Sequence, residues 1–339
     1  MRNSPMNSVI QEDLRRIIES VQSGAFEGKH SLVSGGAGFL GSWIIDVLLL
    51  SGSTVTCVDN LTTGAYDNIR HLRHTKGFKF DKTDVCKYSG NPKVDVVFHL
   101  ASRPAPDDYQ KHPIETALSN SEGTHKMLEL GRRRDARVFY ASSSEVYGDP
   151  PEFPTSESCE GRVNPLGPRS CYDEGKRFGE SLCKAYQDQY GLDIRVGRIF
   201  NSYGPRLRAD GSYGRVISRF IQQAIVGASL TVFGDGSQTR SFCYVSDTVT
   251  AIMRFTAKNH PTYFCLNIGF PEETRIIDLA NEIIRLTASN SSIQLLPFPS
   301  GDYKRRLPNV KAMTEEINWC PSIALAAGLS RTHRWAQDF

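Results

Sequence analysis

Apolar residues from Ser31 onward fall into two kinds of segment that follow each other along the chain. One kind is a short, nearly unbroken apolar run, which is typical of a strand buried on both faces of a sheet. The other is a longer stretch with apolar residues at helical spacing. This alternation indicates a parallel sheet covered by helices on both faces, so we predict a doubly wound α/β fold. The predicted strands are 31–35, 54–59, 94–102, 137–144 and 194–200.

The regions outside this alternating part have different patterns. Within residues 8–21, apolar positions recur every three or four residues, which predicts an amphipathic helix packed on the domain or on a partner subunit. After about residue 200, a polar glycine-rich loop precedes helices near 214–227 and 275–288, and 264–269 has the pattern of one more strand of the main sheet. We predict a helical appendage at 1–29, a main domain at 30–200 with a returning segment at about 243–269, and a smaller α/β lobe at 201–242 and 270–339.

Composition narrows the possible classes of function. The 339 residues carry a formal net charge of +3, which gives no reason to expect a nucleic-acid or membrane surface. The eight cysteines include no Cys-x-x-Cys pair, so we expect reduced thiols and neither a metal site nor a disulfide framework. The N-terminal region has no apolar run long enough for a signal peptide or a membrane span. These features favour a soluble cytoplasmic protein.

The segment between the first predicted strand and the next helix is rich in glycine. Gly35 permits a tight turn, Gly38 lets backbone N–H groups approach a pyrophosphate, and Gly41 lets the helix pack closely on the strand. The helix then points its positive dipole end at the phosphates. Asp59 ends the second strand, where a carboxylate binds the ribose hydroxyls of NAD and repels the 2′-phosphate of NADP. We predict a Rossmann-type fold that binds NAD through Gly35, Gly38, Phe39, Leu40, Gly41, Asp59 and Asn60.

Two other segments, each placed at the end of a predicted strand, complete the expected cofactor site. Ligands of such folds bind at the carboxyl ends of the strands. Asp84 and Val85 are therefore expected on the adenine side, and Leu100 and Ala101 on the nicotinamide side. For His99, a hydrogen-bonded core position is favoured over a catalytic one.

Tyr172 and Lys176 stand four residues apart, so a helix would place both on one face. The spacing by itself fits an ordinary helix surface as well as a proton-transfer pair, because a Tyr-x-x-x-Lys match arises often by chance. A free tyrosine has a pKa of about 10, and a neighbouring ammonium favours its phenolate form. If the pair is functional, Tyr172 is the base and Lys176 lowers its pKa.

Several motifs in order give the chain a family resemblance. These are GGAGFLG (35–41), Asp59, SSSEVYG (142–148) and CYDEGKR (171–177). Together they resemble the extended short-chain dehydrogenase/reductase family over about residues 30–335. Within that family, NPLGPRSCYDEGKRFGE (164–180), RIFNSYGPR (198–206), LTVFGDGSQTRSFCYVSD (230–247) and DYKRRLPNV (302–310) are most similar to the UDP-glucuronic acid decarboxylases. The resemblance implies tightly bound NAD, a C-terminal lobe that binds a UDP-sugar, and a homodimer.

The resemblance also implies roles for individual residues. Tyr172 would accept a proton, with Lys176 as its cation, and Ser143 would hydrogen-bond the sugar hydroxyl. Ser144 and Glu145 would lie beside the pyranose, where Glu145 positions the ring or a proton-donating water, or else only caps the turn. Ser144 replaces the aspartate that dehydratases carry, which argues against dehydration. The residues expected to contact the anionic substrate are Arg103, Asn201, Arg206, Arg240 and Arg306.

Two departures from the decarboxylase pattern affect the expected substrate. Arg103 stands where those enzymes usually have proline, and the loop before Gly214 is longer than theirs. The implied reaction is NAD-dependent decarboxylation of UDP-glucuronic acid to UDP-xylose through a 4-keto intermediate. The alternatives are a UDP-hexose or UDP-hexuronate 4-epimerase, which needs the same Ser, Tyr, Lys and NAD, and a non-catalytic NAD-binding regulatory protein.

Overall fold

A seven-stranded parallel sheet forms the centre of the computed structural model, which describes residues 7–338. The order of the strands is β11-β6-β5-β4-β1-β2-β3, and every neighbouring pair is parallel. The predicted α/β fold class is confirmed. The strands are β1 (His30–Ser34), β2 (Thr54–Val58), β3 (Phe78–Asp81), β4 (Val96–His99), β5 (Arg137–Ser143), β6 (Ile194–Ile199) and β11 (Cys265–Ile268).

The direction of winding reverses between β1 and β4. The chain runs outward from β1 through β2 to β3, then returns to β4 and continues in the other direction to β6. Such a switch point opens a crevice at the carboxyl ends of the two central strands, which is where ligands bind in sheets of this kind. The predicted strand at 264–269 is confirmed, since β11 pairs with β6 at the edge of the sheet.

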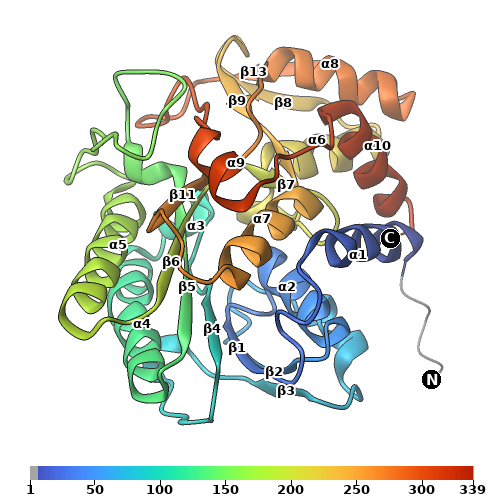
Figure 1. The fold of residues 1–339 in the computed structure, drawn as a ribbon. Helices are drawn as coiled ribbons and strands as arrows, with labels where there is room; N and C mark the ends of the chain where they lie inside the picture. The colour runs from blue at the N-terminus through green and yellow to red at the C-terminus, as the bar shows by residue number, and fades with distance from the viewer. Residues whose placement is uncertain (1–6, 339) are drawn as a thin grey trace.

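Helices cover both faces of the sheet (Figure 1). On one face, α4 (Pro113–Arg134) and α5 (Ser170–Tyr190) pack side by side. On the other, α2 (Phe39–Leu50), α7 (Val245–Ala257) and α1 (Ser8–Ser20) form a layer. Because both faces are covered, the strands are mostly apolar, and each face has its own apolar core.

The predicted N-terminal helix packs on its own chain. Helix α1 buries an apolar stripe that includes Leu14 and Ile17 against α7. Its fully buried Asp13 accepts hydrogen bonds from Tyr244 (2.6 Å) and Arg331 (3.0 Å), so each carboxylate oxygen has a partner. The C-terminal helix α10 (Leu325–Ala336), which carries Arg331, therefore lies beside α1 (Figure 1).

Most of the remaining elements after residue 200 form small sheets and helices above the carboxyl ends of the main strands (Figure 1). The predicted helices near 214–227 and 275–288 are α6 (Val216–Ile225) and α8 (Ile276–Thr287), each shorter than predicted. The other elements are α3 (Pro106–Tyr109), α9 (Lys311–Ile317), the strand pairs β7 (Ser202–Tyr203) with β10 (Cys243–Tyr244), β8 (Leu230–Phe233) with β13 (Ile293–Leu296) and β9 (Thr239–Ser241) with β12 (Glu273–Arg275), and the 3₁₀ helices η1 (Tyr66–Asn68), η2 (Arg70–Leu72), η3 (Val85–Lys87), η4 (Ser144–Tyr147) and η5 (Gly211–Tyr213).

The predicted division into an appendage, a main domain and a lobe stays a prediction. Residues 1–6 of the predicted appendage and residue 339 of the predicted lobe lie outside the described residues. Within 7–338, no helix is both long and apolar enough to cross a membrane.

Candidate active site

A cavity of about 810 Å³ lies at the carboxyl ends of the central strands. It extends from the glycine-rich turn after β1 to Arg240 and Asp302 of the C-terminal part. With one exception, every residue that the sequence predicts for the site lines this cavity. The exception is Arg306, which is buried behind the cavity wall. The structure therefore brings the predicted cofactor and substrate residues together.

The glycine-rich turn leaves no room for side chains at its critical positions. Gly35 has a φ of +73°, and a Cβ atom there would lie 2.7 Å from the backbone nitrogen of Ala101. At Gly41, a Cβ atom would lie 2.2 Å from the carbonyl oxygen of Gly35. Helix α2 begins at Phe39 with no side chain capping its first N–H groups. This end of the cavity thus offers free backbone donors at a helix N-terminus, as a pyrophosphate requires.

Asp59 and Asp84 shape the cofactor end of the cavity. The buried carboxylate of Asp59 accepts hydrogen bonds from the N–H groups of Ala37 (3.0 Å) and Leu61 (2.8 Å), one on each oxygen. Each oxygen keeps a second lone pair for a ribose hydroxyl. The segment 83–85 does not end a strand as predicted. It begins η3, where Asp84 caps the helix and accepts a hydrogen bond from Asn60 (2.7 Å).

His99 is a core histidine, as the sequence favours. It is buried and hydrogen-bonded to the hydroxyls of Ser34 (2.7 Å) and Thr124 (3.0 Å). Burial, with a smaller effect of Lys176, lowers the pKa of its ring to about 3. His99 is therefore neutral at physiological pH and does not line the cavity.

Tyr172 and Lys176 lie together on α5, and both line the cavity. The ammonium of Lys176 donates to the carbonyl of Ala141 (2.8 Å) and lies 5.9 Å from the centre of the Tyr172 ring. The ring of Tyr109, from α3, stacks on that of Tyr172 with centroids 5.2 Å apart. Both side chains are buried, so the pair is not part of an exposed helix surface.

The electrostatics of this pair differ from the sequence-based expectation. Burial raises the pKa of Tyr172 to about 12, although a hydrogen bond with Ser143 and the charge of Arg215 act to lower it. Burial also lowers the pKa of Lys176 to about 7. We expected Lys176 to lower the pKa of Tyr172, but its own charge is weakened by the apolar surroundings. The protein by itself keeps Tyr172 protonated.

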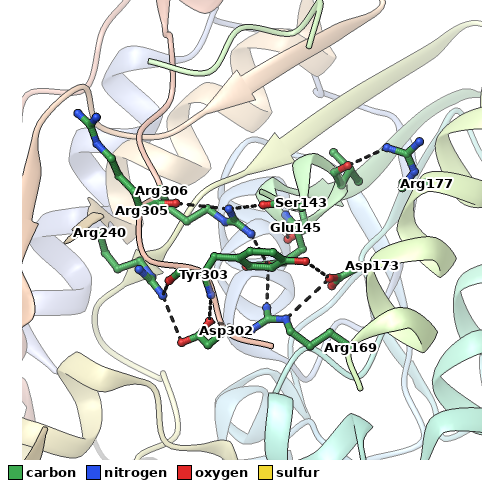
Figure 2. A network of polar contacts seen from close by, with 12 residues as sticks. Ser143, Glu145, Arg169, Asp173, Arg177, Arg240, Asp302, Tyr303, Arg305 and Arg306 are labelled. Atoms are coloured by element: carbon green, nitrogen blue, oxygen red, sulfur yellow. Dashed lines mark hydrogen bonds and ion pairs between the residues drawn. The ribbon is translucent and has the colours of Figure 1, made fainter. Parts of the chain in front are cut away.

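Glu145 belongs to a charged cluster at the end of the cavity that Arg240 and Asp302 line (Figure 2). Its carboxylate accepts hydrogen bonds from Arg169 (2.6 Å) and Arg306 (3.1 Å). Burial acts to raise its pKa, but the guanidinium groups of Arg306 and Arg169 lower it to about 2. The alternative role of Glu145 as a turn cap is not what the structure shows, because the Ser143 hydroxyl accepts the hydrogen bond that caps η4.

We name this group the arginine cluster: Glu145, Arg169, Asp173, Arg240, Asp302, Tyr303 and Arg306. Arg169 binds Asp302 (2.9 Å), and Arg240 binds Asp302 (3.3 Å) and the carbonyl of Tyr303 (2.6 Å). The places of Arg169, Asp173, Asp302 and Tyr303 in this cluster were not predicted from the sequence. All four stand inside the motifs that carry the family resemblance, and that was the available signal.

Asn201 and Arg206 are anchored on the cavity wall. The amide of Asn201 donates to the carbonyl of Ser241 (3.2 Å). Arg206 donates to the buried carboxylate of Asp46 on α2 (2.6 Å) and lies 5.1 Å from the ring centre of Trp43. Their predicted contacts with the nucleotide stay predictions.

Arg103 and the longer loop before Gly214, which differ from the decarboxylase pattern, lie next to each other at the cavity. Arg103 donates to both oxygens of Asp108 (2.7 Å each), so its guanidinium is paired within the chain. Tyr213, from the longer loop, donates to the same carboxylate (3.1 Å) and lies 3.5 Å from the carbonyl of Thr62. The loop at 207–215 is thereby fastened to the segments that follow β2 and β4.

Comparisons with known proteins agree with this geometry. The chain matches the NAD dependent epimerase/dehydratase family over residues 31–269. It is 44% identical over 306 residues to UDP-glucuronic acid decarboxylase 1 of Danio rerio, which covers 90% of this chain and 72% of the relative. It is 41% identical over 303 residues to UDP-glucuronic acid decarboxylase 1 of Arabidopsis thaliana, which covers 88% and 68%.

Solved structures of sugar-nucleotide enzymes share the fold. A UDP-N-acetylglucosamine 4-epimerase from Methanobrevibacter ruminantium M1 superposes with a TM-score of 0.84 at 28% identity, covering 92% of this chain and 99% of the other. UDP-glucuronic acid 4-epimerase from Bacillus cereus, solved with UDP-glucuronic acid and NAD, gives 0.81 at 26% identity, covering 91% and 99%.

Proposed function

The chain belongs to the NAD dependent epimerase/dehydratase family, and from this we propose that it decarboxylates UDP-glucuronic acid to UDP-xylose. The observation that carries the proposal is one cavity in which Ser143, Tyr172 and Lys176 lie near the arginine cluster. The first group suits oxidation at a sugar hydroxyl, and the second suits a substrate with a carboxylate. UDP-glucuronic acid decarboxylases from several organisms are 40% to 44% identical to this chain.

The cofactor is NAD, and the residues at the glycine end of the cavity fit it. We infer that backbone donors after Gly35 hold the pyrophosphate and that Asp59 binds the ribose hydroxyls. Asn60, Asp84 and Val85 would enclose the adenine side, and Leu100 and Ala101 the nicotinamide side. When bound, NAD would supply reversible hydride transfer at C4 of the sugar, so the overall reaction would involve no net oxidation.

Tyr172 is proposed as the base that takes the proton from the 4-hydroxyl group of the sugar. Because burial raises its pKa to about 12, it needs positive charge beside it to act at neutral pH. Arg215 on the cavity wall supplies part of this charge, and Lys176 supplies more when it is protonated. Ser143 would hold the same sugar oxygen through its hydroxyl.

Loss of CO₂ follows from the 4-keto group. A carboxylate on C5 then belongs to a β-keto acid, and the ketone accepts the electron pair of the breaking bond as an enolate. The hydroxyls of Tyr172 and Ser143 would donate hydrogen bonds to that oxygen. We propose that Glu145, beside Ser144, positions the ring or a water that protonates C5. The buried Arg306 would hold the carboxylate of Glu145 in place through its hydrogen bond.

We also infer a cytoplasmic homodimer. Helices α4 and α5 lie side by side and expose Ile114, Leu118 and Phe178, which supports an interface between two copies on this face. A molar mass measured by light scattering during gel filtration tests the inference. A monomer at micromolar concentration would contradict it.

One incubation tests the proposed reaction. Purified protein is mixed with UDP-glucuronic acid, and the products are identified by mass spectrometry and NMR. We expect UDP-xylose and CO₂. Formation of UDP-galacturonic acid would favour the epimerase, and bound NAD without turnover of any UDP-sugar would favour a regulatory protein.

A further inference from the structure

Asp173 is a buried carboxylic acid that the proposed reaction does not use. It follows Tyr172 on α5, is 1% exposed, and does not line the cavity. Its Oδ2 accepts a hydrogen bond from the hydroxyl of Tyr303 (3.1 Å), whereas its Oδ1 has no hydrogen-bond partner among the described residues. The nearest guanidinium nitrogen, Nε of Arg169, is 3.8 Å away.

Tyr303 connects Asp173 to the arginine cluster. Its ring lies between Arg306 and Arg169 in Figure 2, with the guanidinium carbons 4.0 Å and 5.1 Å from its centre. The hydrogen bond to Asp173 fixes the direction of the ring. Asp173 therefore acts on Glu145 indirectly, through the two arginines that bind it.

The charges of the cluster show what is special about Asp173. The three guanidinium groups of Arg169, Arg240 and Arg306 face three carboxyl groups, those of Glu145, Asp173 and Asp302. With all six ionised, the cluster is neutral and has no net charge to attract a substrate carboxylate. With one carboxyl group protonated, it keeps one positive charge.

Among the three acids, Asp173 is the one placed to take the proton. Glu145 and Asp302 each lie within 3.3 Å of two guanidinium groups, but Asp173 has only the more distant contact at 3.8 Å. Burial first, and then the charge of Glu145, raise the pKa of Asp173 to about 7.

The phenols that face Asp173 do not exchange protons in this range. They come from α3, α5 and the segment 302–306, as Tyr109, Tyr172 and Tyr303. Burial raises the pKa of each of these groups, so all three stay protonated near pH 7.

We propose that Asp173 is a positioning residue that holds a proton while the substrate is bound. The protonated form leaves the arginine cluster with one positive charge for the carboxylate of the substrate, and it still accepts the hydrogen bond from Tyr303. Substrate binding above neutral pH is then coupled to the uptake of one proton from the solvent. The proposal rests on the proposed function, because only a UDP-sugar with a carboxylate needs this charge.

Kinetics between pH 6.5 and 8.5 test the proposal, since the acids of the substrate are ionised throughout this range. For the wild type, we expect the KM of UDP-glucuronic acid to rise by about tenfold per pH unit above pH 7.5, the slope for one linked proton. The inhibition constant of UDP-xylose, which has no carboxylate, reports the effect of Lys176, whose pKa is also about 7, and lacks the tenfold rise. Asp173→Asn, which is permanently neutral, makes the KM follow the pH dependence of that inhibition constant.

A second variant tests the count of charges. Asp302→Asn leaves the cluster with one positive charge even when Asp173 is ionised, so we expect the KM above pH 7.5 to fall and its rise with pH to become shallower than in the wild type. An equal slope for the wild type and Asp173→Asn, or no slope for the wild type, would overturn the proposal. These readouts separate positioning from stability, because a merely structural loss changes the amount of active enzyme and not the slope of KM.

Calorimetry gives a test that does not depend on turnover. UDP-glucuronic acid is titrated into the Tyr172→Phe protein at pH 8 in two buffers of different ionisation enthalpy. We expect uptake of close to one proton per site, and none when Asp173 is also replaced by asparagine. Zero uptake would refute the role of Asp173. A wild-type enzyme that releases no CO₂ would instead refute the proposed function.

Discussion

Replacing Arg206 with methionine removes one half of a buried ion pair between α2 and the segment after β7. The carboxylate of Asp46, 2% exposed, accepts hydrogen bonds from Arg206 (2.6 Å) and from His71 (2.8 Å). Methionine keeps much of the aliphatic packing, and as an unbranched residue it tolerates the φ of +74° at this position about as well as arginine does. The change therefore acts mainly on the charge.

The expected loss of stability is large. Removing one partner of a buried ion pair leaves the other charge uncompensated, which costs about 3–5 kcal/mol in the free energy of unfolding. Replacing both residues, as in Asp46→Leu with Arg206→Met, removes the stranded charge and recovers most of that loss. A matched control is Arg70→Met. This exposed arginine pairs with exposed Asp67, so we expect a change within about 0.5 kcal/mol.

The pH dependence of stability gives a second, independent test of the buried ion pair. Burial would raise the pKa of Asp46, but Arg206 and His71 bring it below its usual value. Its contribution to wild-type stability is therefore present above the unfolded pKa of about 3.9 and is lost as the pH falls through the folded pKa. Without Arg206, burial raises the pKa of Asp46. Protonation of Asp46 as the pH falls toward 5 then removes the free-energy cost of burying its unpaired charge.

Urea unfolding followed by tryptophan fluorescence at pH 7.5 and pH 5 measures both effects. We expect the gap between wild type and Arg206→Met to narrow at pH 5. A single variant as stable as the wild type at pH 7.5 would refute the reasoning, as would a double variant that is no more stable than the single one.

Three further predictions concern the cavity. Tyr172→Phe should lower decarboxylation at least about 100-fold while the protein keeps its NAD, measured by CO₂ release and by chromatography of the released cofactor; near-normal turnover would exclude Tyr172 as the base. Gly41→Ala should purify with much less NAD, because the new Cβ would lie 2.2 Å from the Gly35 oxygen, and full occupancy would contradict the predicted turn. Tyr213→Phe loses its hydrogen bond to Asp108, so trypsin should cleave the loop at 207–215 sooner, whereas Tyr190→Phe at the exposed end of α5 should not change this rate; equal rates would show that the hydrogen bond does not fasten the loop.

Local patterns in the sequence were sufficient for much of the fold. Each of the five predicted strands is present, because a strand buried on both faces forms a mostly apolar run that is recognisable without knowing its neighbours. The turn at Gly35 and Gly41 was predictable for a similar reason, since the requirement for glycine lies in the few residues of the turn itself. The Tyr172–Lys176 pair follows from helical spacing within α5.

The charge state of the site depended on tertiary structure. Lys176 was expected to carry its full charge, but burial lowers its pKa to about 7, and burial depends on what packs over the helix. Arg206 pairs with Asp46, 160 positions away in the sequence, and Asp173 binds Tyr303, 130 positions away. No periodicity or spacing records such pairs. The sequence by itself determined which chemical groups are available near the cavity. Only the fold decided which of them are neutralised and which stay charged, because the energy of a charge depends on its distance to other charges and on its exclusion from water.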